Sequence, residues 1–535
     1  MALSSHSRSV RLPVVALACA IVAACGGGSP AQQTPPSSAS VPAAAQDPAV
    51  RRLVMAVVPP GTESNQIRLI TQTESWQLRP TYEHLIGLDP TNGKYVPMLA
   101  TEWSLEPDGM SYRYKLRRGV QFHGGNGEFS AKDVAFSYED TTKPDAVSSE
   151  NNLLRGVVDR VEVVNDYEVV FHLNKPDVDF ESVVSEQQGG LRIMSKAHFD
   201  AIGEPTLQGT PLAGTGPYQF KERAQGSYVR FERVPYQHWR VRPDFPEFEY
   251  RLQTESSGRL AGLLAGEVHI TNLPSDLVPQ AEARGYKIIR GRVPALRSFL
   301  AWQCCFVNSQ TGEYPAHPNS PLLDPRVRQG LNKAINRDEI NRAFFGGKGE
   351  PMHLNHFHPT REGWDPSWVT RFPDEYGYDT ARARSLLAEG GQPNLRTSVI
   401  VRPLALFPGA EDITEAIAGY WRSVGVDVQL ATIDPGEIAA AQRQLRYDNH
   451  SVMVGTSGTQ FVTLAVRRIR VELDPQRRGE LYRQEGNRRF DLQLDVPLFW
   501  LPAEAIVDPK VVADYVFPGS ISGTWTHPEN IKAVR

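Results

Sequence analysis

The sequence predicts an α/β protein in which at least part of the sheet is parallel. Residues 398–401 are rich in valine and isoleucine, like a buried strand, and the amphipathic segment 411–424 that follows predicts a helix. Gly425 ends this helix directly before a second predicted strand at 426–430. Two strands joined through a helix lie parallel in one sheet, so this unit sets the fold class.

The first part of the folded chain predicts a strand, a helix and a hairpin in that order. The apolar run 53–58 ends at a proline pair, as expected for a buried strand that meets a loop. Residues 65–88 have helical spacing. Residues 95–116 alternate and are interrupted by Pro-Asp-Gly at 107–109, which predicts two strands joined by a turn.

A capped helix and a second hairpin follow. Ser130 can accept a hydrogen bond from the free N–H groups of a helix that begins after it, and Asp133 suits the positive end of that helix. Residues 157–173 predict a hairpin with Asn-Asp at its tip, and 228–232 predict another strand.

Helices dominate the next part of the chain. Residues 324–345 and 379–389 each begin at an aspartate that can cap a helix, and each segment is followed by a glycine. No internal repeat is visible in the sequence. The pattern therefore remains that of a mixed α/β protein throughout.

The N-terminus predicts secretion and a lipid anchor. Arg8 and Arg11 precede an apolar run at 14–24, which is too short to span a bilayer and ends in small residues before Cys25. This pattern resembles the bacterial lipobox, in which the cysteine thiol receives diacylglycerol and becomes the first residue. The alternative is an ordinary signal peptide with a chance cysteine. We expect a lipoprotein signal peptide at 1–24.

Residues 25–50 predict the lipidated cysteine followed by a disordered tether. Five prolines lie here among Ala, Ser, Gln and Thr, and Asp47 is the only charge. Such a segment buries too little apolar surface to order itself. Among the remaining cysteines, Cys304 and Cys305 are adjacent and are either two free thiols or a strained vicinal disulfide.

Length and charge narrow the class of protein. At 535 residues the chain exceeds the size of a single hydrophobic core. It carries 57 basic and 61 acidic side chains, for a net charge of −4, which gives no electrostatic reason to expect nucleic acid as a partner. Nine tryptophans and eighteen tyrosines suit a protein that holds ligands against aromatic faces.

The motifs of common enzymes are absent from the sequence. The glycine-rich run at 346–349 lacks the Ser or Thr that follows the lysine of a phosphate-binding loop. Neither a His-Glu-x-x-His zinc helix nor a Gly-x-Ser-x-Gly nucleophile elbow occurs. We therefore predict no catalytic residues, no enzyme activity and no cofactor.

Several short blocks of residues in the middle of the chain occur in a recognisable order. The most recognisable is 114–125 followed by 129–137, and Gly214-Thr215-Gly216-Pro217-Tyr218 is another. Further blocks lie at 82–87, 97–103, 236–239, 324–337, 378–387 and 421–428. Together they resemble the peptide- and nickel-type solute-binding proteins, family 5 of the binding components of ABC importers. The resemblance covers roughly residues 50–535.

This resemblance implies a two-lobed, periplasmic-binding-protein-like fold of type II, cluster C, with the ligand enclosed between the lobes. By analogy, lobe one takes 51–300 plus 499–535, with an extra subdomain at about 80–205, and lobe two takes 305–497. Ligand touches both lobes only when they close, so binding shifts the population toward the closed form.

The resemblance also implies the partners and the location. They are a small-molecule or peptide ligand, the permease and ATPase subunits of an ABC importer, and a membrane reached through the lipid anchor. We expect a monomer, periplasmic or at the cell surface. A carrier of metal chelates or haem, a secreted hydrolase and a sensor on the same scaffold remain alternatives.

Arg402 is the first candidate ligand contact. It follows the strand predicted at 398–401, at the strand end where α/β crevices bind ligands. The resemblance implies that a similar Arg-Pro segment lies in the cleft of peptide-binding members, where a guanidinium can hold a carboxylate bidentately. The alternative is a solvated surface arginine.

The other candidates are aromatic or polar residues in expected loops and crossings. Trp302 and Trp500 lie where the chain is expected to pass between the lobes, and each either lines the cleft or packs the hinge. Loop-rich settings add Trp76, Trp364, Glu63 and Asn65.

One departure from the family pattern restricts the ligand. The dipeptide-binding branch carries an Asp-rich segment of the form W-x-D-x-x-D-P for the free amine, whereas residues 453–460 here contain no carboxylate. Because a buried amine needs a counter-charge, we expect a neutral or anionic solute or a modified peptide. Its hydrogen-bonding partners would be Thr456, Ser457 and Gln460.

His353, His356 and His358 lie in one short segment, so they could ligate a transition metal. The alternative is a polar loop with chance histidines, and it is the one we favour. We therefore predict no metal site.

Overall fold

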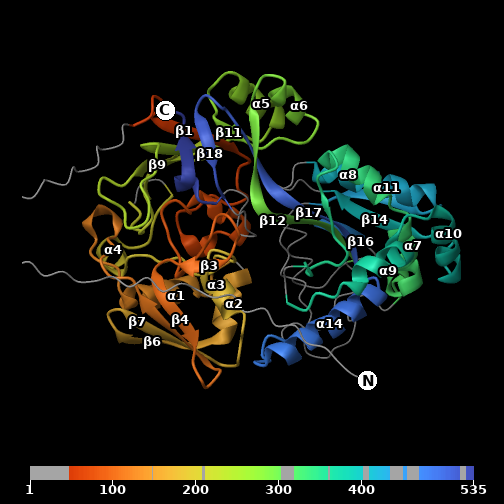
Figure 1. Cartoon of the computed structure of the whole chain (residues 1–535), viewed down its shortest axis with the longest axis horizontal. Helices are drawn as coiled ribbons and strands as arrows, with labels where there is room; N and C mark the ends of the chain where they lie inside the picture. The colour runs from red at the N-terminus through yellow and green to blue at the C-terminus, as the bar shows by residue number, and fades with distance from the viewer. Residues whose placement is uncertain are drawn as a thin grey trace, which may run out of the picture. The chain divides into compact units, whose positions relative to one another are not determined.

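Two long strands organise the described part of the molecule. In the computed structural model, β12 (Lys287–Trp302) and β17 (Asp495–Val507) pair antiparallel along most of their length. Figure 1 shows them running together from the side that carries α5 and α6 to the side that carries α7, α8 and α11. The structure describes residues 47–147, 149–207, 211–302, 319–359, 362–401, 409–433, 450–454, 469–517 and 526–535.

One mixed sheet extends to both sides of this pair. On one side lie β16 (His450–Val454), β14 (Arg396–Val401) and β15 (Asp427–Thr432). On the other side lie β11 (Ile270–Thr271), β1 (Arg52–Val57), β10 (Glu247–Leu252), β9 (Tyr228–Arg233) and β8 (Tyr218–Ala224). The short β13 (Glu350–Pro351) also pairs with β17.

The prediction of parallel strands is confirmed. Strands β14 and β15 pair parallel in register from Arg396 opposite Asp427 to Val401 opposite Thr432. The connecting helix α11 (Ala410–Ser423) packs its apolar face against them through buried Ile413, Ile417 and Trp421. The strand–helix–strand unit therefore forms as its sequence pattern predicts.

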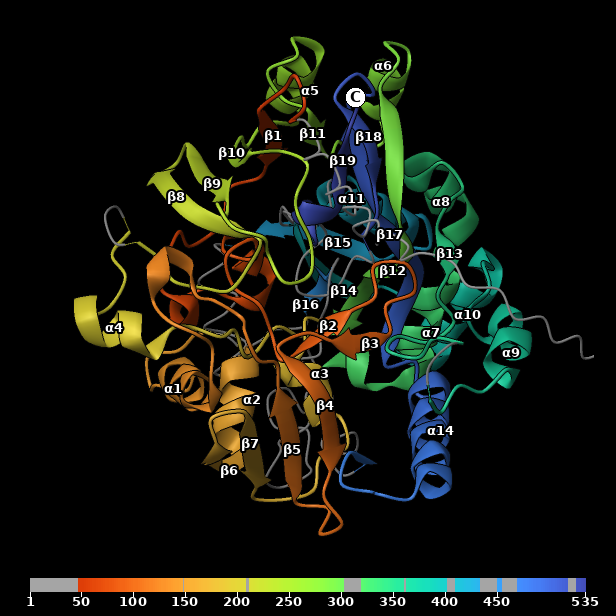
Figure 2. The same ribbon diagram turned by 60° about the vertical axis from the view of Figure 1, so that its left-hand side comes forward.

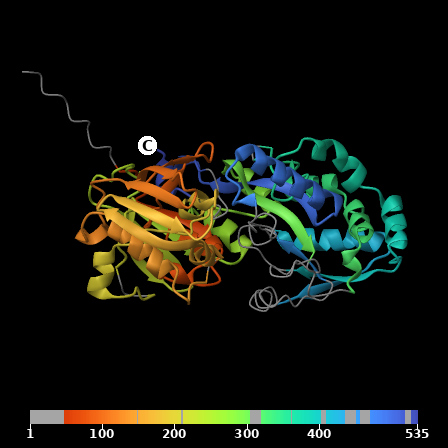
Figure 3. The ribbon, with the colours of Figure 1, turned by 90° about the horizontal axis from the view of Figure 1, so that it is seen from below.

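Lobe two is the half of the sheet with β14–β16 and the helices around it. Helix α10 (Thr380–Glu389) begins as predicted, because Asp379 Oδ1 accepts a hydrogen bond from Arg382 N at 2.8 Å. The other helices of this half are α7 (Pro325–Lys333), α8 (Arg337–Phe345), α9 (Ser367–Tyr376) and α14 (Pro475–Asp491). Figure 3 shows α14 lying on this half.

The single helix predicted at 324–345 is wrong, because two helices occupy this segment. Helix α7 ends at Lys333, and Asn336 then leaves helical geometry with φ −82° and ψ 88°. Its side-chain Oδ1 accepts a hydrogen bond from Glu339 N at 3.1 Å and starts α8. An asparagine that caps a new helix competes with continuation of the old one.

Lobe one carries a second, separate sheet. Strands β4 (Ala100–Leu105), β5 (Ser111–Leu116), β7 (Glu168–Leu173) and β6 (Val158–Asn165) form an antiparallel sheet in this order. Its core contains Phe122, Phe129, Phe171 and Phe180. Helices α1 (Ala131–Thr141), α2 (Ser149–Val157), α3 (Phe180–Val184) and α4 (Lys196–Ile202) accompany this sheet (Figure 2).

Both predicted hairpins and the predicted cap of this region are confirmed. Strands β4 and β5 flank the turn at 107–109, and β6 and β7 flank the turn at 166–167. Ser130 N and Oγ donate to Asp133 Oδ2 at 2.9 and 3.0 Å, which forms the capping box of α1.

The helix predicted within 65–88 is wrong. The segment contains two short 3₁₀ helices, η1 (Ile67–Leu69) and η2 (Gln72–Gln77), followed by β2 (Ile86–Leu88), which pairs with β3 (Tyr95–Pro97). Pro80 lacks an N–H and disfavours helical geometry at the residue before it, so a long helix cannot pass this point.

The remaining elements complete lobe one. They are α5 (Ser256–Leu264), α6 (Val278–Glu282), β18 (Val512–Tyr515) and β19 (Ile531–Ala533). Asp47 Oδ1 lies 2.8 Å from Arg233 Nη2, so this residue of the predicted tether contacts lobe one. In the described ranges, no helix has the length and apolarity that a bilayer crossing demands.

Two glycines of the Gly-Thr-Gly-Pro-Tyr block allow close backbone packing. A Cβ on Gly214 would lie 2.0 Å from Thr81 O, and one on Gly216 would lie 2.3 Å from Pro80 O. His123 is held here as well, because its Nε2 lies 2.7 Å from Gly216 O. The block therefore joins the segment at 80–81 to the start of β8.

An ion-pair cluster is buried in lobe one between distant segments. Arg240 Nε donates to Glu83 Oε1 at 2.6 Å, and Arg240 Nη1 lies 2.7 Å from Glu529 Oε1. Burial opposes the charge on Arg240, but Glu529 and Glu83 outweigh it and raise the pKa of the guanidinium. Burial also opposes the charge on Glu529, but Arg240 and then His527 lower the pKa of that carboxyl. The cluster therefore holds the C-terminal segment to the sheet as a charged unit.

The substitution Gly214→Ala should lower the free energy of unfolding by about 2–3 kcal/mol or prevent folding, because the methyl group has no space beside Thr81 O. Urea denaturation measures the change. Gly156→Ala is the control, because a Cβ there meets nothing within 4 Å and should be neutral or slightly stabilising. Equal effects at both positions would contradict the close approach.

Glu529→Gln should flatten the acid side of the stability profile. A carboxyl whose folded pKa lies below its unfolded value of 4.5 stabilises the fold above that value and loses this contribution as pH falls. The variant should lose about 1–3 kcal/mol of the free energy of unfolding at neutral pH and less at about pH 3. Urea denaturation at several pH values tests this, and parallel profiles for both proteins would refute it.

Candidate functional site

The point where the chain passes between the lobes lies within the β12–β17 pair. Residues 287–290 of β12 face 504–507 of β17 in lobe one, where β17 also pairs with β11. Residues 296–301 face 495–501 in lobe two, where β12 also pairs with β16. Because both strands continue from one lobe into the other, they are the connection about which the lobes can turn.

The hydrogen-bond ladder is interrupted at this crossing. Pro294 faces Pro502, and the register shifts between Arg290 and Pro294 and again between Pro294 and Leu296. Proline has no N–H, so neither residue can donate a ladder hydrogen bond. The pairing is therefore weakest between the two lobes.

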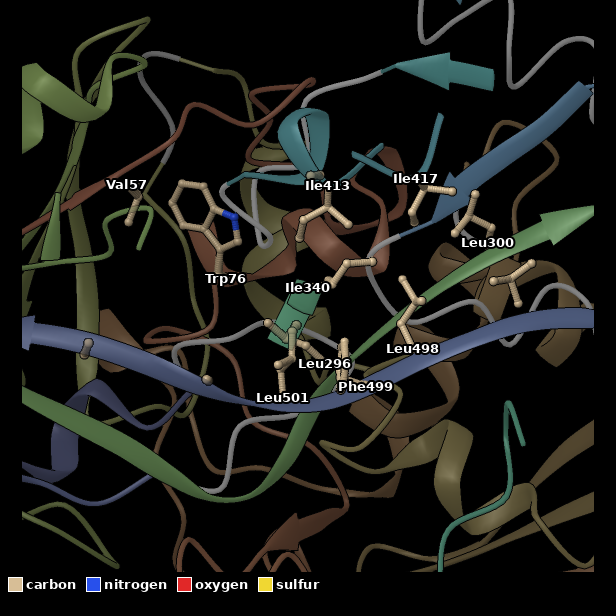
Figure 4. Packing of buried hydrophobic residues seen from close by; sticks show 14 of the residues in the cluster. Val57, Trp76, Leu296, Leu300, Ile340, Ile413, Ile417, Leu498, Phe499 and Leu501 are labelled. Carbon is tan, nitrogen blue, oxygen red and sulfur yellow. The ribbon is translucent and has the colours of Figure 1, made fainter. Parts of the chain in front are cut away.

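One face of the crossing strands borders a cavity of about 240 Å³. Leu296 and Leu501 lie together where the strands cross, with Ile340 of α8 beside them (Figure 4). Both leucines line the cavity, together with Val278 of α6 from lobe one and Phe345 from the end of α8 in lobe two. The cavity thus lies behind the crossing between elements of both lobes.

The opposite face carries a buried polar and aromatic cluster. Arg297 and Trp500 are the strand neighbours of Leu296 and Leu501, so their side chains point to this other face. Arg297 Nη1 donates to Asn355 Oδ1 at 3.1 Å and lies 2.7 Å from His356 Nδ1. The ring of His358 meets Trp500 edge-on, with 5.3 Å between centroids.

Two features mark this face as a candidate functional surface. His356 has φ +73°, a left-handed conformation that is unfavourable for a non-glycine residue and that concentrates at functional sites. Asp495 is buried beside the cluster, and burial raises the pKa of its carboxyl although Arg489, 3.6 Å away, acts in the opposite direction. No motif pointed to Arg297, Asn355 or Asp495, although each lies within five residues of a tryptophan or histidine considered in the sequence.

Trp302 lies in the core of lobe two. Its ring stacks on Trp421 with 6.0 Å between centroids, and its Nε1 donates to Gln493 O at 2.8 Å. Trp76 packs edge-on against Tyr250 in lobe one and is also buried. Both side chains thus contribute to packing in this structure.

Trp364 is half-buried beside Trp368 and His353 in lobe two. Glu63 and Asn65 lie in lobe one, and both bind Arg223. Asn65 Nδ2 also donates to the backbone oxygens of Thr206 and Leu207. These contacts give Glu63 and Asn65 a structural role around a buried arginine, and their role toward a ligand stays a prediction.

Several predicted positions lie outside the described residues. They are Arg402, Thr456, Ser457, Gln460, Cys25, Cys304 and Cys305. Arg402 follows β14 directly, and β14 is the central strand of the lobe-two sheet beside β16. Because β14 ends at Val401, Arg402 comes directly after a strand end, as predicted from the sequence.

The three clustered histidines have separate environments. His353 packs against Phe372 and Trp364, His356 lies beside Arg297, and His358 Nε2 lies 3.2 Å from Glu350 Oε1. Within the described ranges, no group of three or more His, Cys, Asp or Glu is placed to hold a metal ion.

The lobes also meet at a second place. Arg470, in the segment that leads into α14 of lobe two, lies 2.8 Å through its Nε from Asp177 Oδ1 beside α3 of lobe one. Val178 N donates to Arg470 O at 2.9 Å. Sequence reasoning missed this contact, because the two segments are separated by 293 residues and neither carries a motif.

Comparison with known proteins identifies a family. The model of "Bacterial extracellular solute-binding proteins, family 5 Middle" matches residues 94–463. The dipeptide-binding protein of Escherichia coli (strain K12) is 26% identical over 407 residues, which are 71% of this chain and 70% of that protein. A probable di/tripeptide-binding protein 5 of Pseudomonas aeruginosa is 27% identical over 428 residues, 76% of each chain.

Solved structures share the fold. The ABC transporter-associated periplasmic binding protein DppA from Helicobacter pylori, in complex with the peptide STSA, superposes with a TM-score of 0.72 and 22% identity over 90% of this chain and 98% of that one. A dipeptide-binding protein from Pseudoalteromonas in complex with Met-Leu also gives 0.72, with 21% identity over 90% and 100%. The two-lobed fold expected from the sequence is confirmed.

Amide hydrogen exchange should be fastest at the centre of β12. The segment 291–295 should exchange about tenfold or more faster than 296–301, because the ladder is interrupted at Pro294 and Pro502. Residues 287–290 of the same strand are the control and should exchange as slowly as 296–301. Mass spectrometry of peptic fragments measures this, and uniform protection along β12 would contradict a weak point there.

Proposed function

Because this chain belongs to the bacterial extracellular solute-binding proteins, family 5, we propose that it captures a peptide-like solute between two lobes and delivers it to the permease of an ABC importer. The family is one of binding proteins and not of enzymes. The proposed lobes follow the bounds expected from the sequence, about 51–300 plus 499–535 and about 305–497, with an extra subdomain at about 80–205. The crossing at Pro294 and Pro502 lies a few residues from these bounds. Relatives named for dipeptides and tripeptides support the solute class.

The paired crossing strands are the observation that carries this proposal. Both passages between the lobes run through β12 and β17, and the ladder between them is interrupted at Pro294 and Pro502. Rotation at this point changes the distance between the lobes without unfolding either half of the sheet. A ligand bound at about micromolar affinity supplies about 8 kcal/mol, which is enough to bias such an equilibrium strongly toward closure.

The two faces of the β12–β17 pair have different roles when the lobes close. The face with Arg297, His356, His358 and Trp500 supplies polar and aromatic groups suited to a solute, and Trp500 is the predicted contact among them. The cavity of about 240 Å³ lies on the other face, where α6 and the end of α8 can approach or separate as the lobes turn.

The solute is a peptide with a blocked or otherwise uncharged N-terminus, or a neutral or anionic compound of similar size. The segment 453–460, with Thr456, Ser457 and Gln460, has no carboxylate to pair with a free amine. Arg402, after β14, supplies a guanidinium for a carboxylate on the solute. Trp76, Trp364, Glu63 and Asn65 are secondary candidates.

The chain is held near its permease by lipid on Cys25. The signal at 1–24 would be removed, and the diacylglycerol on Cys25 would leave the folded part tethered through the proline-rich segment. The family description as extracellular supports the location outside the cytoplasm. A monomer suffices for capture, since both lobes belong to one chain.

Calorimetry with defined peptides tests this proposal. An N-acetylated tripeptide with a free carboxylate should bind with at least about tenfold higher affinity than the same tripeptide with a free amine, because only the amine lacks a counter-charge. Native mass spectrometry of the purified protein, searching for a retained small molecule, identifies the natural solute. Tight binding of the unblocked peptide would refute the solute class, and no retention of any peptide or other small solute would refute capture itself.

A variant of Arg402 locates the site in the same experiment. Arg402→Ala should abolish the tryptophan fluorescence change on titration with the acetylated tripeptide while the melting temperature stays nearly the same. Arg396→Ala is the matched control, because Arg396 is an exposed residue of the same strand that pairs with Asp427 at 2.8 Å. An unchanged titration of the Arg402 variant would remove this residue from the site.

A further inference from the structure

We propose that Arg470, with Asp177 and Asp179, forms a latch between the lobes that determines how long the captured solute stays bound. The inference rests on the proposed function, because it assigns a role in retention to residues outside the predicted ligand contacts. It makes Arg470 a positioning residue, which acts on the solute through the arrangement of the lobes.

The contact joins the two lobes through both side chain and backbone. Arg470 Nε donates to Asp177 Oδ1 at 2.8 Å, and Arg470 Nη2 lies 3.6 Å from Asp179 Oδ2. The backbone oxygen of Arg470 accepts from Val178 N at 2.9 Å. One residue of lobe two thus binds three consecutive residues of lobe one.

The partners belong firmly to different lobes. Arg470 precedes α14, which is fixed to lobe two by Trp368 Nε1 donating to Asn487 Oδ1 at 2.8 Å and Tyr376 Oη donating to Phe490 O at 2.9 Å. Asp177 lies just before α3 in lobe one. Its backbone oxygen accepts a hydrogen bond from Tyr112 Oη of β5, in the four-stranded sheet, at 3.1 Å. Movement of one lobe relative to the other must therefore break this contact.

The acceptor is held in place before the lobes meet. Asp177 Oδ1 also accepts from Asp179 N at 3.0 Å, so the local turn orients the carboxyl without help from Arg470. The side chain of Asp177 is 6% exposed and that of Arg470 is 14% exposed. An acceptor oriented by its own turn loses little conformational entropy when the guanidinium arrives.

The contact joins opposite charges, although burial raises the pKa of the Asp177 carboxyl against the opposing effect of Arg470. The two aspartates lie on one side and a single guanidinium on the other, and Asp179 and Asp177 outweigh burial and raise the pKa of Arg470. When the lobes part, water replaces both hydrogen bonds, so the ion pair contributes its stabilisation only to the form in which the lobes touch. An ion pair that stabilises only the closed form shifts the equilibrium between open and closed forms toward closure.

A second contact lies beside the ion pair. Leu473 Cδ1 is only 2.6 Å from the position that a Cβ on Gly109 would take. Gly109 has φ +67° in the turn between β4 and β5. The chain leading into α14 thus passes along the end of the four-stranded sheet, as Figure 2 shows. A glycine at this turn lets the leucine approach the backbone, and the latch has an apolar part next to its ionic part.

Small-angle scattering without added solute tests the latch directly. Arg470→Ala should increase the radius of gyration relative to the wild type, because the closed form loses its ion pair. With the acetylated tripeptide, the same variant should release the peptide about tenfold faster, while the association rate changes less than about twofold. The melting temperature should stay close to that of the wild type.

Matched variants separate a latch from a general structural role. Arg477→Ala removes an exposed pair with Glu480 on α14 that touches only lobe two, and it should change neither scattering nor release. Arg470→Ala combined with Asp177→Asn should behave like Arg470→Ala alone, because the two residues act through one contact. Additive effects of the two substitutions would overturn the pairing.

The outcomes distinguish the latch from the proposed function. Identical scattering curves for the wild type and Arg470→Ala without solute would overturn the latch, whatever the solute is. A larger radius of gyration for Arg470→Ala, with no peptide or other solute retained by either protein, would support the latch and refute the capture of solutes. Faster release together with unchanged scattering would also overturn it, since Arg470 would then act on the solute and not on the lobes.

Discussion

Both passages of the chain between the lobes are made by one antiparallel pair of strands, and the rest of the structure depends on this constraint. Since β12 and β17 are hydrogen-bonded to each other, the lobes cannot move independently of this pair. The sheet continues outward from the pair on both sides, so each lobe is attached to one half of the pair. The proposed rotation of the lobes falls where Pro294 and Pro502 face each other without N–H groups.

Charged residues have different effects within a lobe and between lobes. Arg240, Glu83 and Glu529 are buried together inside lobe one, where no movement of the lobes exposes them, so they stabilise the fold in every conformation. Arg470 and Asp177 come from different lobes, so their pair stabilises only the conformation in which the lobes touch. An ion pair within one lobe therefore stabilises that lobe, whereas an ion pair between lobes changes the equilibrium between the open and closed forms.

Local interactions explain which elements could be predicted. The hairpins around 107–109 and 165–166, the cap at Ser130 and Asp133, and the β14–α11–β15 unit each depend on residues close in the chain, so their patterns are visible in the sequence. The helix expected within 65–88 failed because Pro80 prevents a long helix there, and two short 3₁₀ helices form instead. The helix expected at 324–345 failed because the capping by Asn336 competes with helix continuation.

Sequence patterns alone were sufficient to assign the α/β class, several of the strands and helices in order, a signal-like N-terminus and a resemblance to the family. These follow from periodicity, capping and short blocks of residues, all of which act over a few positions. The packing of Trp302 in the core, the face that Arg297 and Trp500 share with His356, and the contact of Arg470 with Asp177 became visible only in the folded structure. These contacts join segments from 59 to 293 residues apart, and they depend on how whole sheets pack, which no local pattern in the chain encodes.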